Sequence, residues 1–215
     1  MDGEFDELGA LSPVGAGKME ALPEAQQRYG DNFLFSARRW PQGAINPDEY
    51  DVFVNSVGQP GQGFPNMTHW CTNLPAGGGQ VPAGQSWAIS KVGVVSAPGN
   101  RYDDVINFAM VGTLYINKQG NVRNMGQVCF WPGGSGLTGI GVADTNPLTT
   151  FVPAVSNGVP AAGAMQELDT PILLAEMEVV KFGFRINNHA AWTVVGNQFI
   201  ATCVLYGQFN ETIPT

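Results

Sequence analysis

The sequence predicts an all-β protein folded as a two-sheet antiparallel sandwich, with an eight-stranded single jelly roll as the expected arrangement. Beyond Trp40, apolar runs of strand length recur, and each is bounded by Gly, Pro or Asn. Several of these runs alternate apolar and polar residues, as half-buried strands do. Helical periodicity is scarce by comparison. Strands of this number and spacing are typical of two packed antiparallel sheets.

The strand pattern recurs along most of the chain. The clearest alternation is at 108–116, and the polar stretch 118–121 then turns the chain into the next run, which predicts a hairpin. A short helix is predicted at 102–107, and the glycine-rich segment 133–141 is predicted to be a long loop. The predicted strands lie at residues 50–55, 67–74, 86–95, 108–116, 122–131, 148–155, 171–175, 178–186, 192–195 and 198–207.

The first part of the chain differs in composition from the rest. Residues 1–30 hold six acidic and two basic residues, hence a net charge of −4, and show no sustained period. We therefore predict a loosely ordered acidic N-terminal arm at 1–40, followed by a β-sandwich (jelly-roll) domain at 41–215. A dense apolar and basic cluster ends the arm and is predicted to anchor it at an assembly interface. Its members are Phe33, Phe35, Arg38, Arg39 and Trp40.

Composition favours a protein with large contact surfaces. Charged residues make up only 13% of the chain, against about 25% in an average globular domain, and the cores of protein interfaces are depleted in charge. The net charge is −8, and the ten Lys and Arg residues are scattered. Because neutralising phosphates requires clustered basic residues, direct nucleic-acid binding is not expected.

No catalytic or metal-binding motif is evident, so we predict a protein that is not an enzyme and holds no cofactor or metal. His69 and Cys71 share a face if their segment is a strand, but no second pair completes a zinc site. Glu176 and Glu178 are candidates for a general acid of a glycoside hydrolase. Together with His69 and His189, they are the basis of the weakest hypothesis, a hydrolase on a β-sandwich.

Cysteine usage and the N-terminus bear on the compartment. Cys71, Cys129 and Cys203 are widely spaced and odd in number, which disfavours a disulfide framework and predicts small buried core residues. The acidic N-terminus is unlike a signal peptide, and no apolar run approaches the roughly eighteen residues of a membrane span. We therefore expect synthesis in the cytoplasm.

Two segments carry a resemblance to a known family. Residues 74–94 (LPAGGGQVPAGQSWAISKVGV) and 198–207 (QFIATCVLYG) resemble a strand-turn-strand unit and the final strand of jelly-roll major capsid proteins. The family is that of tailless icosahedral bacterial or archaeal viruses, including viruses with an internal membrane. The acidic arm departs from the basic arms with which many small-virus capsid proteins hold their genome.

The resemblance implies a virion protein, made in the host cytoplasm, that assembles with copies of itself and with related subunits. Trimers or pseudo-hexamers are the expected capsomers, terminal arms tie neighbours together, and some members lie close to an internal membrane. No catalytic residue is implied. The alternative is a carbohydrate- or receptor-binding module, such as a phage spike or lectin-like domain, which the five tryptophans favour.

Overall fold

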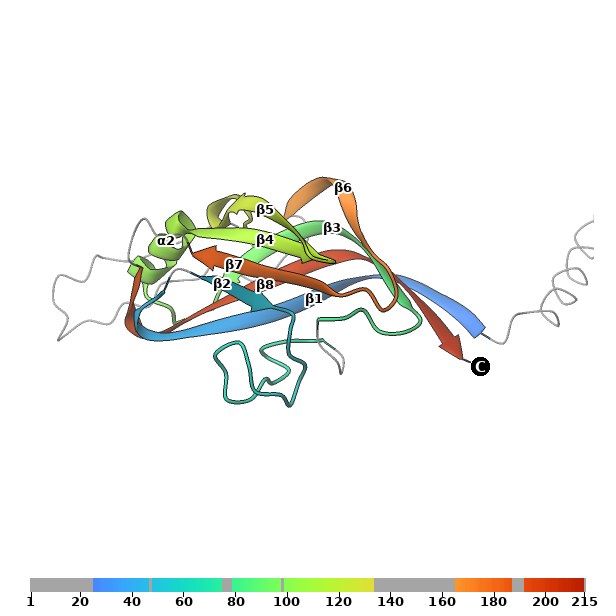
Figure 1. Ribbon diagram of the computed structural model, residues 1–215, viewed down its shortest axis with the longest axis horizontal. Coiled ribbons are helices and arrows are strands. Elements are labelled where there is room, and N and C mark those ends of the chain that lie inside the picture. The colour runs from blue at the N-terminus through green and yellow to red at the C-terminus, as the bar shows by residue number, and fades with distance from the viewer. Residues whose placement is uncertain are drawn as a thin grey trace, which may run out of the picture.

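The computed structural model describes residues 25–46, 48–74, 79–97, 99–133, 165–186 and 192–214, which form a β-sandwich (Figure 1). The predicted fold class, two packed antiparallel sheets, is confirmed. One four-stranded sheet has the order β1-β8-β3-β6 and the other has the order β2-β7-β4-β5. The elements are β1 (Ala25–Ala44), β2 (Glu49–Val52), β3 (Gln85–Ser96), α2 (Tyr102–Val111), β4 (Gly112–Lys118), β5 (Asn121–Gln127), the 3-10 helix η1 (Val128–Phe130), β6 (Gln166–Leu174), β7 (Val180–Ile186) and β8 (Thr193–Pro214).

Strand pairing follows a simple rule. The first strand pairs with the last, β2 with β7, β3 with β6 and β4 with β5, always antiparallel. Two further pairings, β3 with β8 and β4 with β7, join these pairs into the two sheets. Because β1 and β8 pair from Ala25 to Ala44, they run out together at the end of the sandwich opposite α2 (Figure 1).

The predicted arm overlaps the first strand. Residues 25–40, which the sequence analysis assigned to the arm, lie in β1 and are hydrogen-bonded to β8. Strand β1 therefore supplies one edge of the first sheet. Residues 1–24, the predicted loop beyond residue 133 and the predicted strand at 148–155 lie outside the described residues.

Helix α2 extends further than predicted and corrects the strand predicted at 108–116. It continues through Val111, and β4 begins at Gly112. Val105, Phe108 and Ala109 are buried, as helical spacing requires, whereas Met110 is exposed. The apparent alternation at 108–110 therefore came from the last turn of an amphipathic helix that leads directly into a strand.

The strand predicted at 67–74 is wrong, because this segment is a turn. The backbone N–H groups of Cys71 and Thr72 donate to the carbonyl oxygen of Thr68, at 2.8 and 3.2 Å. The segment instead covers the edge of β1, where the N–H of Ala37 donates to the carbonyl of Cys71 at 2.7 Å. Met67 and Cys71 are buried in this loop, whereas Trp70 faces solvent.

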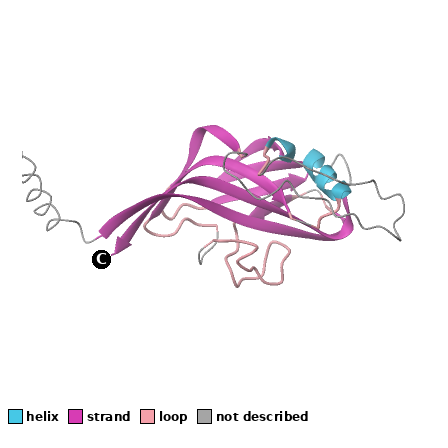
Figure 2. Cartoon of the chain, turned by 180° about the vertical axis from the view of Figure 1, so that it is seen from behind, coloured by secondary structure: helices cyan, strands magenta, loops and turns pink. Residues whose placement is uncertain are grey.

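An aromatic cluster fills the end of the sandwich next to α2. The ring centroids of its members lie 5.0–5.9 Å apart. Figure 2 shows the helices gathered at this end, with strands and loops at the other. We call this the α2 end. The cluster consists of Trp40, Phe108, Phe184, Trp192 and Phe199, each no more than 2% exposed.

Candidate functional site

The five residues predicted to anchor an arm are split between two faces of β1. Trp40 belongs to the buried aromatic cluster and so faces the other sheet. Phe33 and Phe35 face outward, where they pack with Val95, Met165, Val204 and Tyr206. Arg38 and Arg39 are half-buried. Alternation along the strand therefore separates residues that are close in sequence.

Arg38 closes the seam between the two sheets at their β1 and β2 edges. Its Nη1 donates to the carbonyl oxygen of Asp51 at 3.1 Å, and its guanidinium carbon lies 4.6 Å from the ring centroid of Tyr50. Burial lowers the pKa of Arg38, although nearby Tyr50 and Asp51 favour its charged form. The side chain therefore satisfies an edge carbonyl of β2 that has no strand partner on that side among the described residues.

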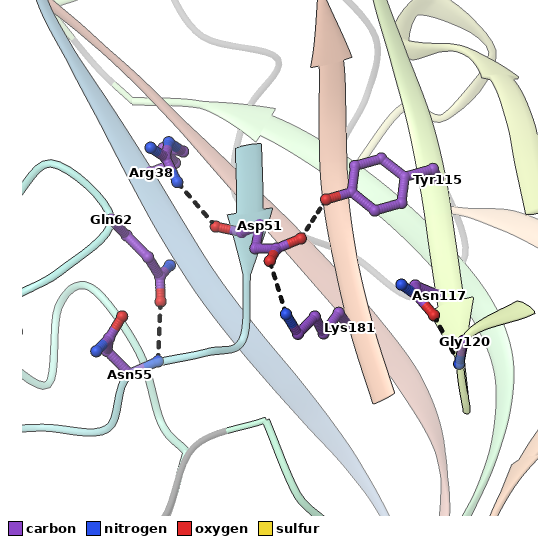
Figure 3. A network of polar contacts seen from close by, with 8 residues as sticks. All are labelled: Arg38, Asp51, Asn55, Gln62, Tyr115, Asn117, Gly120 and Lys181. Carbon is purple, nitrogen blue, oxygen red and sulfur yellow. Dashed lines mark hydrogen bonds and ion pairs between the residues drawn. The ribbon is translucent and has the colours of Figure 1, made fainter. Parts of the chain in front are cut away.

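A polar row crosses the outer face of the second sheet. Asp51 on β2 and Tyr115 on β4 are both in register with Gly183 on β7, the strand between them. The Tyr115 hydroxyl donates to one carboxylate oxygen of Asp51, and Lys181 donates to the other at 3.1 Å (Figure 3). Next to the row, Arg185 is paired with Glu49.

Gly183 makes this row possible. A Cβ atom at this position would lie 2.6 Å from Cζ and the hydroxyl oxygen of Tyr115, so any larger residue would displace the ring. The ring instead lies across β7 and is only 1% exposed. Burial, followed by the hydrogen bond to Asp51, raises the pKa of Tyr115 far above its ordinary value. The raised pKa favours the neutral phenol as a hydrogen-bond donor, and its bond to Asp51 joins β4 to β2 across β7.

This row was not predicted from the sequence, because its residues come from three separate segments. One local pattern could have indicated the row. In the strand predicted at 178–186, Gly183 stands between Lys181 and Arg185 on the face opposite the apolar residues. A glycine inside a strand often marks a close approach of another group.

The described residues among those proposed for hydrolysis or metal binding do not form one site. Glu178 is buried and holds the β6–β7 turn, since it accepts from the N–H of Ala175 at 2.8 Å and pairs with Lys118 at 3.2 Å. Glu176 is exposed in the same turn, whereas His69 is exposed on the loop beside β1. His189 lies outside the described residues. Within the described ranges, no three His, Cys, Asp or Glu side chains gather as metal ligands.

The three cysteines differ in their surroundings. Cys71 and Cys203 are buried, and burial raises the pKa of the Cys203 thiol. Cys129 is exposed, which corrects the prediction of a buried residue. All three are free thiols.

Among the helices that the structure describes, none has the length and apolar character to cross a membrane.

The end of the sandwich opposite α2 contains open space. A groove of about 410 Å³ opens there, and its lining combines apolar residues with the Lys118–Glu178 pair and with Ser86, Gln208 and Asn210. A smaller apolar cavity of about 40 Å³ lies next to it, and Trp87 and Leu174 line both. Trp87 stacks on Phe209, with ring centroids 5.3 Å apart. We call this the groove end.

Large apolar side chains are exposed on several parts of the surface. Three of them, Leu173, Met177 and Val179, lie together along the chain from the end of β6 to the start of β7, next to the groove. Among the large apolar residues that the structure describes, Trp70 is the most exposed, at 92%, and it lies on the loop beside β1. Contiguous exposed apolar residues, such as those beside the groove, are typical of interaction sites, whereas a single exposed apolar residue is common on protein surfaces.

No protein-family model matches the sequence, and no curated protein matches it.

Proposed function

We propose that the sandwich is a single jelly roll and that the protein is a structural subunit of an icosahedral viral capsid. The observation that carries the fold proposal is the pairing of β1 with β8, β2 with β7, β3 with β6 and β4 with β5. A chain that pairs in this way is folded in half, and the doubled ribbon is then wrapped into two sheets. Eight strands in two Greek keys are the definition of a jelly roll.

The fold alone does not determine function, because jelly rolls occur in capsid proteins, lectins and cupins. The surface supports the shell role. From Val52 to Ser90 the chain has no Asp, Glu, Lys or Arg, and exposed apolar residues lie on this segment and beside the groove. Such a surface loses little solvation when a neighbouring subunit covers it. The expected partners are copies of the same chain and related capsid proteins, in trimers or pseudo-hexamers, with no direct nucleic-acid contact.

The acidic segment 1–24 fits this proposal as a tie between subunits. It precedes Ala25, where β1 begins. Twenty-four extended residues reach as far as about 80 Å, which is enough to contact a neighbour. Their negative charge suits a protein partner better than a genome.

The proposal is tested by the association state of the purified full-length chain. Light scattering and electron microscopy across salt and pH should reveal capsomers or particles. A chain that stays monomeric under every condition, and that does not enter particles formed with other shell subunits, would overturn the proposal.

The second candidate is a carbohydrate- or receptor-binding module on a virion, and the exposed ring of Trp70 favours it, because sugars stack on such rings. A glycan array distinguishes the two candidates. Saturable binding that disappears in a Trp70→Ala variant would support recognition of a glycan, whereas a shell subunit should show none.

A further inference from the structure

We propose that Trp70 of one copy of the chain inserts into the groove of a second copy, and that this contact joins subunits within the capsomer. The inference rests on the proposed function and specifies its interface. Two observations support it. The Trp70 side chain is exposed on the loop beside β1, and a groove with apolar walls borders β6, at the other edge of the same sheet.

Trp70 is exposed on a turn whose backbone is anchored to β1. Its turn is closed by the backbone hydrogen bonds to Thr68 and by a contact of 3.5 Å between Thr68 Oγ1 and Cys71 Sγ. Cys71 is buried beside Ala37 and Met67, so the turn is anchored to β1 while Trp70 points away from it. Of the five tryptophans, all within the described residues, the other four are no more than 9% exposed. Tryptophan is enriched among interface hot spots, and an anchored backbone lowers the entropy lost when such a residue is bound.

The groove has the size and chemistry to accept an indole ring. Its volume of about 410 Å³ lies within the range of pockets that bind small molecules, about 300–1,000 Å³. Leu173, Phe209 and Ala175 supply apolar walls, and the exposed amide of Gln208 can accept from the indole N–H. The Lys118 ammonium lies at the same wall, where it can contact a ring face.

Trp70 and the groove lie at opposite edges of the same sheet. The Trp70 loop covers the β1 edge through Ala37 and Arg39, whose N–H groups donate to Cys71 and Gln62. The groove borders β6, which is the other edge of the order β1-β8-β3-β6. Figure 1 shows the loop below β1 and β6 above. A contact between opposite sides is heterologous, so it builds closed rings when the rotation between copies closes.

The first experiment compares association of the full-length wild-type chain with a Trp70→Ala variant by analytical ultracentrifugation. We expect at least about 30-fold weaker association in the variant, as for a hot-spot residue, with an unchanged unfolding midpoint. Phe130→Ala, which also removes an exposed aromatic ring, should associate like the wild type. Acrylamide should quench Trp70 fluorescence in dilute protein and lose access on association.

The second experiment tests the groove and the direction of the contact. Leu173→Glu places a charge at the exposed groove wall and should weaken association as Trp70→Ala does, whereas Val122→Glu on β5 should not. A mixture of the two deficient variants should form heterodimers, because the intact Trp70 of one still fits the intact groove of the other. The heterodimer should not grow further.

The outcomes separate this inference from the proposed function. If wild-type capsomers form and Trp70→Ala forms them equally well, the contact is overturned and the shell role stands. A mixture that associates no better than its separate components also overturns the contact. A wild-type chain that never associates overturns both.

Discussion

The two ends of the sandwich are filled in different ways. At the α2 end, five aromatic rings interlock and leave little room, since Trp40 contacts the other four and also lies 5.6 Å from Tyr50. At the groove end, the rings of Trp87 and Phe209 stack as a pair beside a cavity and a groove. Tight packing at one end stabilises the fold, and this leaves the other end free to remain open for a partner.

The largest expected effect comes from removing one ring at each end. Phe199→Ala should destabilise the protein by about 3–5 kcal/mol, because a fully buried ring leaves a cavity among three others. Phe209→Ala should cost only about 1–2 kcal/mol, because this ring is partly exposed. Urea unfolding of both variants measures the difference. Equal losses would contradict the comparison.

The next largest effect is expected at Gly183 on β7, between the two ends of the sandwich. Gly183 lies between Phe184 of the aromatic cluster and Phe182, which lines the cavity. Gly183→Ala should destabilise by about 2–3 kcal/mol, because the new Cβ collides with Tyr115 and separates it from Asp51.

A double-mutant cycle supplies the control for Gly183. In a Tyr115→Ala background, the same Gly183→Ala change should cost much less, because the ring it meets is gone. Urea unfolding of the four proteins measures the coupling. An undiminished cost would mean that the glycine is required for another reason.

The sequence predicted those elements whose signals are local, and it failed where the conformation depends on tertiary contacts. Strands such as 86–95 and 178–186 were predictable, because apolar periodicity and turn residues are local signals. The helix α2 was predicted only in its first part, since Phe108 and Met110 fit either period over so short a segment. The turn at 68–72 was missed, because its conformation depends on docking against β1.

The candidate site was less predictable than the fold. Trp70 was visible as one of five tryptophans, but its exposure depends on the loop that carries it. The groove combines residues from β3, β6 and β8 with Lys118, at separations that no local pattern reveals. The predicted anchor residues were close in sequence, but the alternation of the strand places Phe33 on the outer face of β1 and Trp40 on the inner face.

A smaller effect is expected from adding one methylene group at each end. Val194 is fully buried at the α2 end, so Val194→Ile should cost about 1–2 kcal/mol through overpacking. Val81 lines the apolar cavity at the groove end, where Val81→Ile has room and should be neutral or stabilise by about 0.5 kcal/mol. Thermal and urea unfolding measure both. A destabilised Val81→Ile would show that the cavity closes in solution.

The smallest effect concerns pH and the row between the two ends. Burial and the bond to Asp51 raise the pKa of Tyr115 above its unfolded value of about 10. Above that pH the unfolded chain loses a proton that the folded chain keeps. The contribution of Tyr115 to the free energy of unfolding is therefore fully present below pH 10 and falls as the pH rises. The slope approaches about 1.4 kcal/mol per pH unit for this one group, hence a loss of about 1 kcal/mol between pH 10 and pH 11. Urea unfolding at pH 8, 10 and 11 should show this loss in the wild type and less of it in Tyr115→Phe.

The buried Cys203 thiol, whose pKa is also raised, adds a slope of the same sign from about pH 9, and it remains in both proteins. Parallel slopes would therefore mean that Tyr115 ionises in the folded protein, and that the row does not hold its proton.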